Sequence, residues 1–477
     1  MLREKYLHVS KGGDTMRIRL YHAKILTMQP NTDWFEGEVW IHDNRIEKVI
    51  QYNTENYIGN LTVDGQILKT DELSKGLCNN TYEAKDIYFD QQIDCMGNLL
   101  MPGFKNCHAH GPMTFLRSFA DDLPLQQWLN TMIFPAEAKL QEEDIYTLMQ
   151  LAILEYLRGG ITTSFEMYFY PEMIAKACID MGYRVVISGT VFGDDNGVEA
   201  AIKTLQKDYS TFHQCHSLVD YRLGFHSEYS CCKKLLQEIA HLCQQYKAPV
   251  YMHNSETELE VRQCLSRHGK TPVQLMDELG LFEYGGAGHH MLYTNEKDMD
   301  IMRNRGIYVV TNPSSNLKLA SGIAPVRSYI DKGIKVAIGT DGPASNNNLN
   351  FFKEMYLATT LQKVKYNDAA AVKPEHVLQM ATVNGAHLLG LTDTDCIAEG
   401  KQADLILIDL LKPNMQPLNH LVNNLIYSGS NDNVIMTMIA GNILYVNGTY
   451  CNGINPLDIY EKANYIIRRI ECALSNT

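Results

Sequence analysis

Histidine and acidic residues recur in this sequence directly after apolar segments. The first of these segments runs through Leu99 to Pro102 and Gly103 and leads to His108 and His110, which are separated by one residue. Residues two apart in an extended strand point to the same side, so both imidazoles can reach one cation. Alone, the pair has an ordinary alternative, two polar residues at the end of a strand.

Later apolar segments end in residues of the same chemical types, and together they strengthen the metal interpretation. Three neutral imidazoles and one carboxylate suit a divalent ion such as zinc, with one position left for water. Water bound in this way has its pKa lowered toward neutrality and becomes a nucleophile at physiological pH. The predicted ligands of a single metal ion are His108, His110, His253 and Asp341.

Two further residues are predicted to be catalytic. Glu256 lies three residues beyond His253, where it can move a proton between the water and a leaving group. His289 can orient that water or polarise the substrate. Simpler alternatives remain, because Glu256 can be an acid at the N-terminus of the next helix and Asp341 a turn carboxylate in Thr-Asp-Gly.

Eight apolar segments with strand character carry these residues and alternate with helical segments. One helix is clear from residue 142 to residue 158, where apolar residues recur at spacings of three and four before Gly159 and Gly160. Eight strands and their helices over about 250 residues are typical of an α/β protein with a (β/α)8 TIM-type barrel. The active site of such a barrel lies at the C-terminal ends of the strands, which is where the candidate residues fall.

The two ends of the chain predict a second unit. Short strands with turn signals precede the barrel and return after it, so we expect a β-sandwich subdomain built from N- and C-terminal segments. A final helix is expected from Leu457 to about Leu474. The predicted parts are a tail (1–15), the first part of the sandwich with a polar insert (16–97, insert about 51–88), the barrel (98–391) and the second part with the final helix (392–477).

Composition limits the classes of partner. With 477 residues, 45% of them hydrophobic, the chain can bury a large core. The net charge of −13 disfavours nucleic acid, which needs a clustered basic surface. No segment resembles a signal peptide or a membrane span, and the twelve cysteines have no framework spacing, so we expect a cytoplasmic protein without membrane contact.

A site with two metal ions bridged by a carboxylated lysine is the main structural rival. Such a site needs a lysine at the end of the fourth barrel strand. His226 occupies that position, so one metal ion is favoured.

Several longer motifs are more specific than the histidine pair: PGFKNCHAH, RSFADDLPLQQWL, IFPAEAKL, HSEYS, HNSET, TNPSSNLKLASGIAPV and GTDGPASNNNLNFFKEM. They resemble the amidohydrolase superfamily, and within it the 5′-methylthioadenosine/S-adenosylhomocysteine deaminases and the related triazine chlorohydrolases. The resemblance covers about residues 16 to 448. It implies a metal-dependent barrel beside a β-sandwich, which agrees with the strands inferred above.

The resemblance also implies roles for individual residues. It gives the same four metal ligands, Glu256 as the proton shuttle and His289 as the partner of the water. Asn312, Ser315 and Asn316 are expected to support the metal site. Glu137 would bind ribose hydroxyls, and His226 would contact the sugar side of the substrate. Trp128 would line the pocket, although a tryptophan of the core and a solvated acid at Glu137 are the ordinary alternatives.

The implied reaction is hydrolytic deamination at C6 of an adenine nucleoside: 5′-methylthioadenosine, S-adenosylhomocysteine or adenosine. The alternatives are deamination or dechlorination of another heteroaromatic ring (guanine, cytosine or triazine type) and a barrel scaffold without catalysis. The expected cofactor is one divalent ion per subunit, zinc with iron or manganese as alternatives, and a homo-oligomer (dimer or tetramer) is expected.

Two features depart from the family pattern. Members that accept S-adenosylhomocysteine are expected to hold its carboxylate with arginine. Residues 193–209, after the third strand, contain none, which favours a smaller nucleoside. The pair His289 and His290 leaves open which histidine faces the metal, and we choose His289 because it directly follows Gly288 at the expected strand end.

Overall fold

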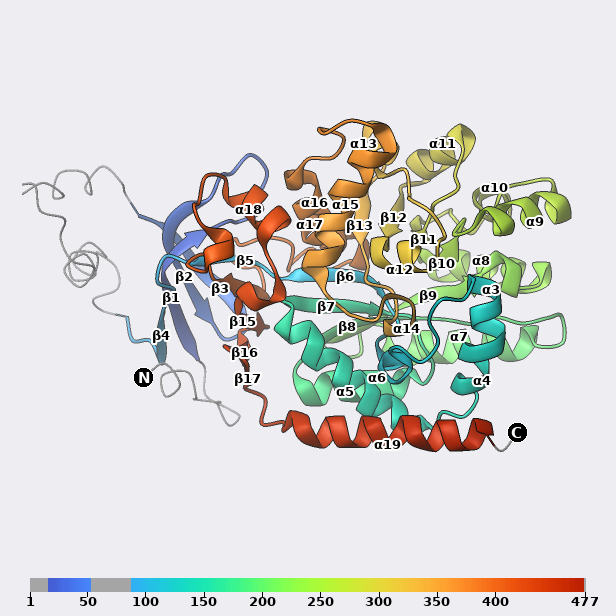
Figure 1. The fold of residues 1–477 in the computed structure, drawn as a ribbon, viewed down its shortest axis with the longest axis horizontal. Coiled ribbons are helices and arrows are strands. Elements are labelled where there is room, and N and C mark those ends of the chain that lie inside the picture. Colours follow the sequence, from blue (N-terminus) through green and yellow to red (C-terminus); the bar gives the residue numbers. More distant parts are fainter. Residues whose placement is uncertain (1–15, 53–86, 476–477) are drawn as a thin grey trace, which may run out of the picture.

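A computed structural model describes residues 16–52 and 87–475. The predicted N-terminal tail and nearly all of the predicted polar insert lie outside the described residues. Two sheets organise the rest of the chain, an eight-stranded parallel sheet and a nine-stranded mixed sheet (Figure 1). The boundaries of the four predicted parts remain predictions.

The parallel sheet is the expected barrel, and its strands follow one another in chain order from β6 to β13. All six residues of β6 and all five of β10 are buried, as expected for strands covered on both faces. The strands are β6 (Phe104–Ala109), β7 (Ile161–Glu166), β8 (Arg184–Ser188), β9 (Val219–Ser227), β10 (Val250–Asn254), β11 (Gly286–His290), β12 (Ile307–Thr311) and β13 (Val336–Ile338).

Hydrogen bonds between the first strand and the residues that directly follow the last strand bring the two edges of this sheet together. The backbone N–H of Asp341 donates to the carbonyl of His108 at 2.9 Å. At the preceding residue, the backbone N–H of Thr340 donates to Oδ1 of Asn106 at 2.9 Å, and the Asn106 amide donates to the Thr340 hydroxyl at 2.7 Å. The barrel therefore closes at the strand ends that carry His108 and Asp341.

Helices surround the barrel strands. The predicted helix at residues 142–158 is confirmed as α5, whose C-cap is the predicted Gly159. The helices between the strands are α3 (Leu125–Trp128), α4 (Phe134–Glu137), α5 (Glu142–Arg158), α6 (Pro171–Met181), α7 (Val198–Phe212), α8 (Lys233–Tyr246), α9 (Glu258–His268), α10 (Pro272–Glu278), α11 (Glu296–Arg305), α12 (Pro313–Lys318) and α13 (Val326–Asp331).

The chain after β13 returns to the outside of the barrel and then to the mixed sheet. Its helices are α14 (Pro343–Asn346), α15 (Phe351–Tyr366), α16 (Pro374–Ala381), α17 (Val383–Leu389) and α18 (Leu421–Ser428). The predicted final helix is α19 (Pro456–Ser475), which runs along α5 at the lower edge of Figure 1.

The predicted β subdomain is present as a separate mixed sheet built from both ends of the chain (Figure 1). Its central strands pair β5 with both β1 and β14, so segments about 300 residues apart lie side by side. The strands are β1 (Arg17–Ile25), β2 (Phe35–His42), β3 (Arg45–Gln51), β4 (Gln91–Asp94), β5 (Leu99–Pro102), β14 (Leu405–Ile408), β15 (Val434–Ile439), β16 (Asn442–Val446) and β17 (Thr449–Tyr450).

The apolar segment before His108 is thus divided between the two sheets. β5 pairs within the mixed sheet, and the first barrel strand begins at Phe104. At the junction a Cβ on Gly103 would lie 2.1 Å from Cγ2 of Thr162, so only glycine allows this crossing. A buried ion pair also joins the two units, with Nε of Arg184 2.7 Å from Oδ2 of Asp404.

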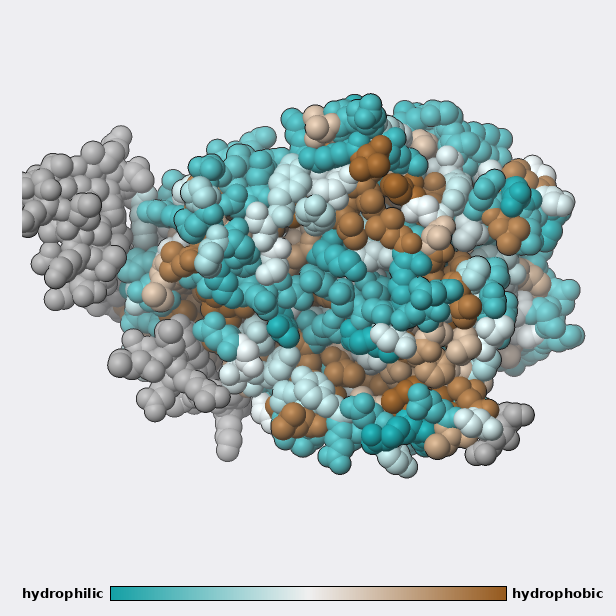
Figure 2. Space-filling view, viewed as in Figure 1, coloured by the Kyte–Doolittle hydropathy of each residue, from teal (hydrophilic) through white to brown (hydrophobic). Residues whose placement is uncertain are grey.

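Hydrophilic residues cover most of the face seen in Figure 2, and hydrophobic residues emerge in smaller groups between the helices. Among the described helices, none has the length and apolar character needed to cross a membrane.

Candidate functional site

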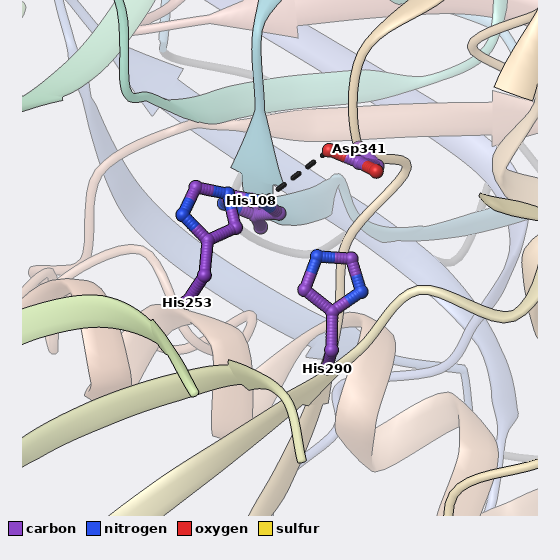
Figure 3. Close-up of side chains that lie close together, drawn as sticks. All are labelled: His108, His253, His290 and Asp341. Atoms are coloured by element: carbon purple, nitrogen blue, oxygen red, sulfur yellow. Dashed lines mark ion pairs between the residues drawn. The ribbon is translucent and has the colours of Figure 1, made fainter. Parts of the chain in front are cut away.

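Residues at the ends of seven of the eight barrel strands line a cavity of about 270 Å³. Figure 3 shows four of the residues at this end of the barrel, with their side chains directed toward a common space: His108, His253, His290 and Asp341. One potential ligand atom from each of these four lies within 4.8 Å of the others, and all four are buried. Three of the four predicted ligands, His108, His253 and Asp341, belong to this group.

His110 joins the same group, and the spacing of the ligand atoms suits a metal ion. Oδ1 of Asp341 lies 3.3 Å from Nε2 of His108 and 3.2 Å from Nε2 of His110. Nε2 of His110 lies 3.4 Å from Nε2 of His253. Tetrahedral bonds of about 2.1 Å separate neighbouring ligand atoms by about 3.4 Å. These three separations are close to those between neighbouring ligand atoms of a tetrahedral zinc site.

Backbone carbonyls set the tautomers of two of these histidines. Nδ1 of His253 lies 2.7 Å from the carbonyl of His226, and Nδ1 of His110 lies 2.6 Å from the carbonyl of Met167. A carbonyl can only accept, so Nδ1 carries the hydrogen in both rings. Each Nε2 then presents its lone pair to the shared space, as metal-binding histidines do.

Two hydroxyl groups orient the carboxylate of Asp341. Ser315 and Ser345 donate to its Oδ2 at 2.6 and 2.8 Å. Oδ1 is left to face the histidines. The sequence singled out Asn312, Ser315 and Asn316 as supporting residues but missed Ser345. The signal was available, because Ser345 follows Asp341 by four residues at the start of α14.

The charge states also fit a cation. Burial lowers the pKa of His108 to about 3 and that of His253 well below its usual value, so both rings are neutral at physiological pH. Burial acts to raise the pKa of Asp341, but its contacts with His108 and His110 outweigh this and hold the pKa well below its usual range. Both ring nitrogens of His108 lack a hydrogen-bond partner among the described residues. Neutral imidazoles beside a buried carboxylate are the donor set of a divalent metal.

Glu256 faces the same cavity and is 5% exposed. The sequence left open that it serves as an acid at a helix N-terminus. The N-terminus of α9 is instead capped by Thr257 and Glu260, which form a capping box. Glu260 also accepts the backbone N–H groups of Ser255 and Glu256, at 2.8 and 2.7 Å. The Glu256 carboxyl is thereby free of a capping role, and burial raises its pKa.

Of the two adjacent histidines, His290 lines this cavity and His289, which we chose from the sequence, does not. Nδ1 of His290 lies 3.9 Å from Oε1 of Glu256 and donates to Oδ1 of Asn316 at 2.8 Å. His289 instead lies inside the barrel, its ring stacked on that of His108 with centroids 3.9 Å apart.

The physical reason for this placement is the way in which β11 ends. Strand alternation puts His289 on the same side as Ala287, which is packed in the barrel interior. The backbone then turns at His290, whose φ of +72° is in the left-handed region. This turn directs the His290 side chain to the mouth of the barrel.

The three residues expected to contact substrate all line the cavity. The Tyr168 hydroxyl donates to Glu137 at 2.6 Å, and burial raises the pKa of Glu137 to about 7. Nδ1 of His226 lies 2.9 Å from the hydroxyls of Ser227 and Ser230. Trp128 is 4% exposed and donates to the carbonyl of Ala120 at 2.8 Å, so it belongs both to the core and to the cavity wall.

Comparisons with known proteins agree with this architecture. The family model described as "Amidohydrolase family" matches residues 99–444. A 5-methylthioadenosine/S-adenosylhomocysteine deaminase of Caldicellulosiruptor saccharolyticus is 34% identical over 433 residues, which cover 91% of this chain and 94% of the relative. A 5′-deoxyadenosine deaminase of Methanothermobacter thermautotrophicus is 39% identical over 399 residues, covering 83% and 91%.

Solved structures show the same fold. An adenosine deaminase from Xanthomonas campestris with bound zinc has a TM-score of 0.82 at 29% identity, with 96% of this chain and 99% of that chain covered. Atrazine chlorohydrolase from Arthrobacter aurescens with zinc has a TM-score of 0.81 at 20% identity, covering 94% and 100%. Since the family model spans most of the chain and both relatives match over most of their length, this chain belongs to the amidohydrolase family.

Proposed function

We propose that this protein is a metal-dependent hydrolytic deaminase that acts at C6 of an adenine nucleoside and releases ammonia. The observation that carries the proposal is the convergence of His108, His110, His253 and Asp341 at the cavity that the buried carboxyl of Glu256 also lines. The relatives named as 5-methylthioadenosine/S-adenosylhomocysteine and 5′-deoxyadenosine deaminases support an adenine nucleoside as the substrate class.

The four ligands would hold one divalent ion, and we propose zinc because both the donor set and the zinc-bound structural relative fit it. When bound, such an ion makes water nucleophilic at neutral pH. Iron and manganese are the alternatives that metal analysis distinguishes. We also retain the cytoplasmic location and the homo-oligomer as expectations.

The remaining side chains divide the work of the reaction. Glu256 takes the proton of the attacking water and delivers it to the departing amine. His290, fixed by its hydrogen bond to Asn316, holds the water or the ring nitrogen next to C6 in place of the role first given to His289. Glu137 binds the ribose hydroxyls, and His226 and Trp128 form the wall of the cavity on the sugar side.

The test is ammonia release from 5′-methylthioadenosine, adenosine, S-adenosylhomocysteine, guanine and cytosine, with an atrazine-type chlorotriazine tested for chloride release. Turnover of an adenine nucleoside is expected. Activity on guanine, cytosine or triazine alone would overturn the substrate class but not the hydrolytic chemistry. No turnover of any of these compounds by metal-loaded protein would favour the scaffold alternative.

Two variants separate the metal from the proton transfer. His253→Ala is expected to lose both bound metal and turnover. Glu256→Gln keeps the shape of the side chain and should retain the metal while kcat falls by roughly 10²- to 10⁴-fold, the usual contribution of general acid–base catalysis. A fully active Glu256→Gln enzyme would contradict the role of Glu256.

A further inference from the structure

A second cavity of about 820 Å³ opens from the first. It lies beside β8 and α7, and the two cavities share six lining residues: Phe134, Glu137, Tyr168, Phe169, Thr190 and Phe192. Glu137 lines both cavities and is the residue proposed to bind the ribose hydroxyls, so the second cavity adjoins the ribose end of the proposed nucleoside site. This position makes it the natural place for a 5′ substituent.

The walls of this cavity are mainly apolar and lack positive charge. Phe134, Phe169, Leu140 and Ala201 contribute apolar surface. Among the described residues that line it there is no lysine, arginine or histidine, and the acidic ones are Glu137 and Asp208. A carboxylate placed here would have no cationic partner, and desolvating it would be costly.

Two polar groups in the wall have no partner. Tyr221 is 1% exposed, and its hydroxyl forms no hydrogen bond among the described residues. Asp208 on α7 is 7% exposed, and no described residue forms a hydrogen bond or ion pair with its carboxylate. Asp208 on α7 and Tyr221 on β9 line the same cavity from two elements that pack against each other, and we call these two residues the polar patch. A buried hydroxyl such as that of Tyr221 is normally satisfied by a partner.

The patch lies away from the metal ligands. Tyr221 precedes His226 by five residues on β9, which corresponds to about 16 Å at 3.3 Å per residue. A ligand that fills both cavities therefore needs an apolar stem between the nucleoside and the patch.

We propose that the second cavity binds an apolar 5′ substituent whose far end is an amine, received by the Asp208 carboxylate and the Tyr221 hydroxyl. This inference rests on the proposed function. An ammonium group donates to both partners and neutralises a buried negative charge, whereas a terminal carboxylate would face Asp208 without a counter-ion. The cavity thus selects for the charge at the end of the substituent.

The test compares kcat/KM for 5′-(aminoalkyl)thioadenosines of increasing chain length with that for the 5′-alkylthioadenosines of matching length. At the length that reaches the patch, the amine is expected to be preferred by roughly 10- to 100-fold, the value of a hydrogen bond to a charged group. S-Adenosylhomocysteine, which adds a carboxylate, should be a poorer substrate than the aminopropyl compound, which has the same thioether chain without it.

Two variants assign any preference to the patch. Asp208→Asn and Tyr221→Phe should each reduce the ratio of amine to alkyl kcat/KM, and Asp208→Asn should have the larger effect because it removes the charge. Glu199→Gln is the matched control, since Glu199 is an acid on the same helix that pairs with Lys203 outside the cavity. It should leave the ratio unchanged.

The possible failures are distinguishable. If 5′-methylthioadenosine and adenosine are not deaminated at all, the proposed function fails and this inference fails with it. If they are deaminated but the amine has no advantage at any length, or Asp208→Asn and Glu199→Gln behave alike, the inference alone is wrong.

Discussion

Replacing Ser315 and Ser345 by alanine should weaken metal binding without touching a metal ligand. Both hydroxyls donate to Oδ2 of Asp341, at 2.6 and 2.8 Å, and leave Oδ1 facing His108 and His110. Without them the carboxylate can rotate, and its buried Oδ2 has no donor. The ligand would then have to be reordered each time a metal ion binds.

The magnitude follows from the kind of hydrogen bond that is lost. A bond to a charged acceptor contributes about 1.5–3 kcal/mol, and mutation of a residue that supports a ligand typically costs 10- to 100-fold in metal affinity. Each single variant keeps one donor on Oδ2, so we expect a loss near the lower limit, about tenfold. The double variant leaves Oδ2 bare and should lose about 100-fold or more.

Competition with a chromogenic chelator of known zinc affinity measures this loss directly. Ser314→Ala is the matched control, because Ser314 is the neighbouring residue and its buried hydroxyl has no partner among the described residues. It should bind zinc as the unmodified protein does. If the double variant also binds zinc with unchanged affinity, the orientation of Asp341 by these hydroxyls is irrelevant to the metal centre and the reasoning fails.

Two further predictions concern stability. Arg184→Met leaves the Asp404 carboxylate, which is 1% exposed, without its ion-pair partner. The free energy of unfolding measured in urea should fall by about 3–5 kcal/mol. The double variant Arg184→Met/Asp404→Asn should recover part of this loss. If the double variant is no more stable than Arg184→Met, the loss is not caused by the unpaired charge of Asp404. Burial raises the pKa of Glu354 from 4.5 to about 7, so its folded form holds a proton that its unfolded form releases. The stability that Glu354 contributes is therefore fully present below pH 4.5 and is lost as the pH rises through 7. Between pH 4.5 and 7, the free energy of unfolding of Glu354→Gln should rise by up to about 3 kcal/mol relative to that of the unmodified protein. Equal pH dependence of the two unfolding free energies would refute this.

The barrel was predictable because its signal is local and repeated. Each buried parallel strand is a short apolar run, and the strands from Ile161–Glu166 to Val336–Ile338 follow one another in chain order, so no pairing had to be guessed. Residues at the C-terminal ends of such strands must share one face. Therefore His108, His253 and Asp341 could be placed together before any coordinates were known.

The choice between His289 and His290 shows where local pattern stops being sufficient. Strand alternation correctly puts the two side chains on different sides, but it does not say where the strand ends. The left-handed φ of His290 ends it one residue later than we assumed. A non-glycine residue rarely adopts the left-handed conformation, and the sequence Gly-His-His-Met does not predict it.

The second cavity could not have been predicted from any local pattern. Asp208 occupies a helical segment and Tyr221 a strand, where the ordinary interpretations are a solvated acid and a core aromatic. Only the packing of α7 against β9 turns both toward one space and leaves each without a partner. The residues that hold the metal are constrained by the shared edge of the barrel, whereas those that would select the substrate depend on how one surrounding helix is seated. Two chains with the same motifs can therefore share the reaction and differ in the substituent that they accept.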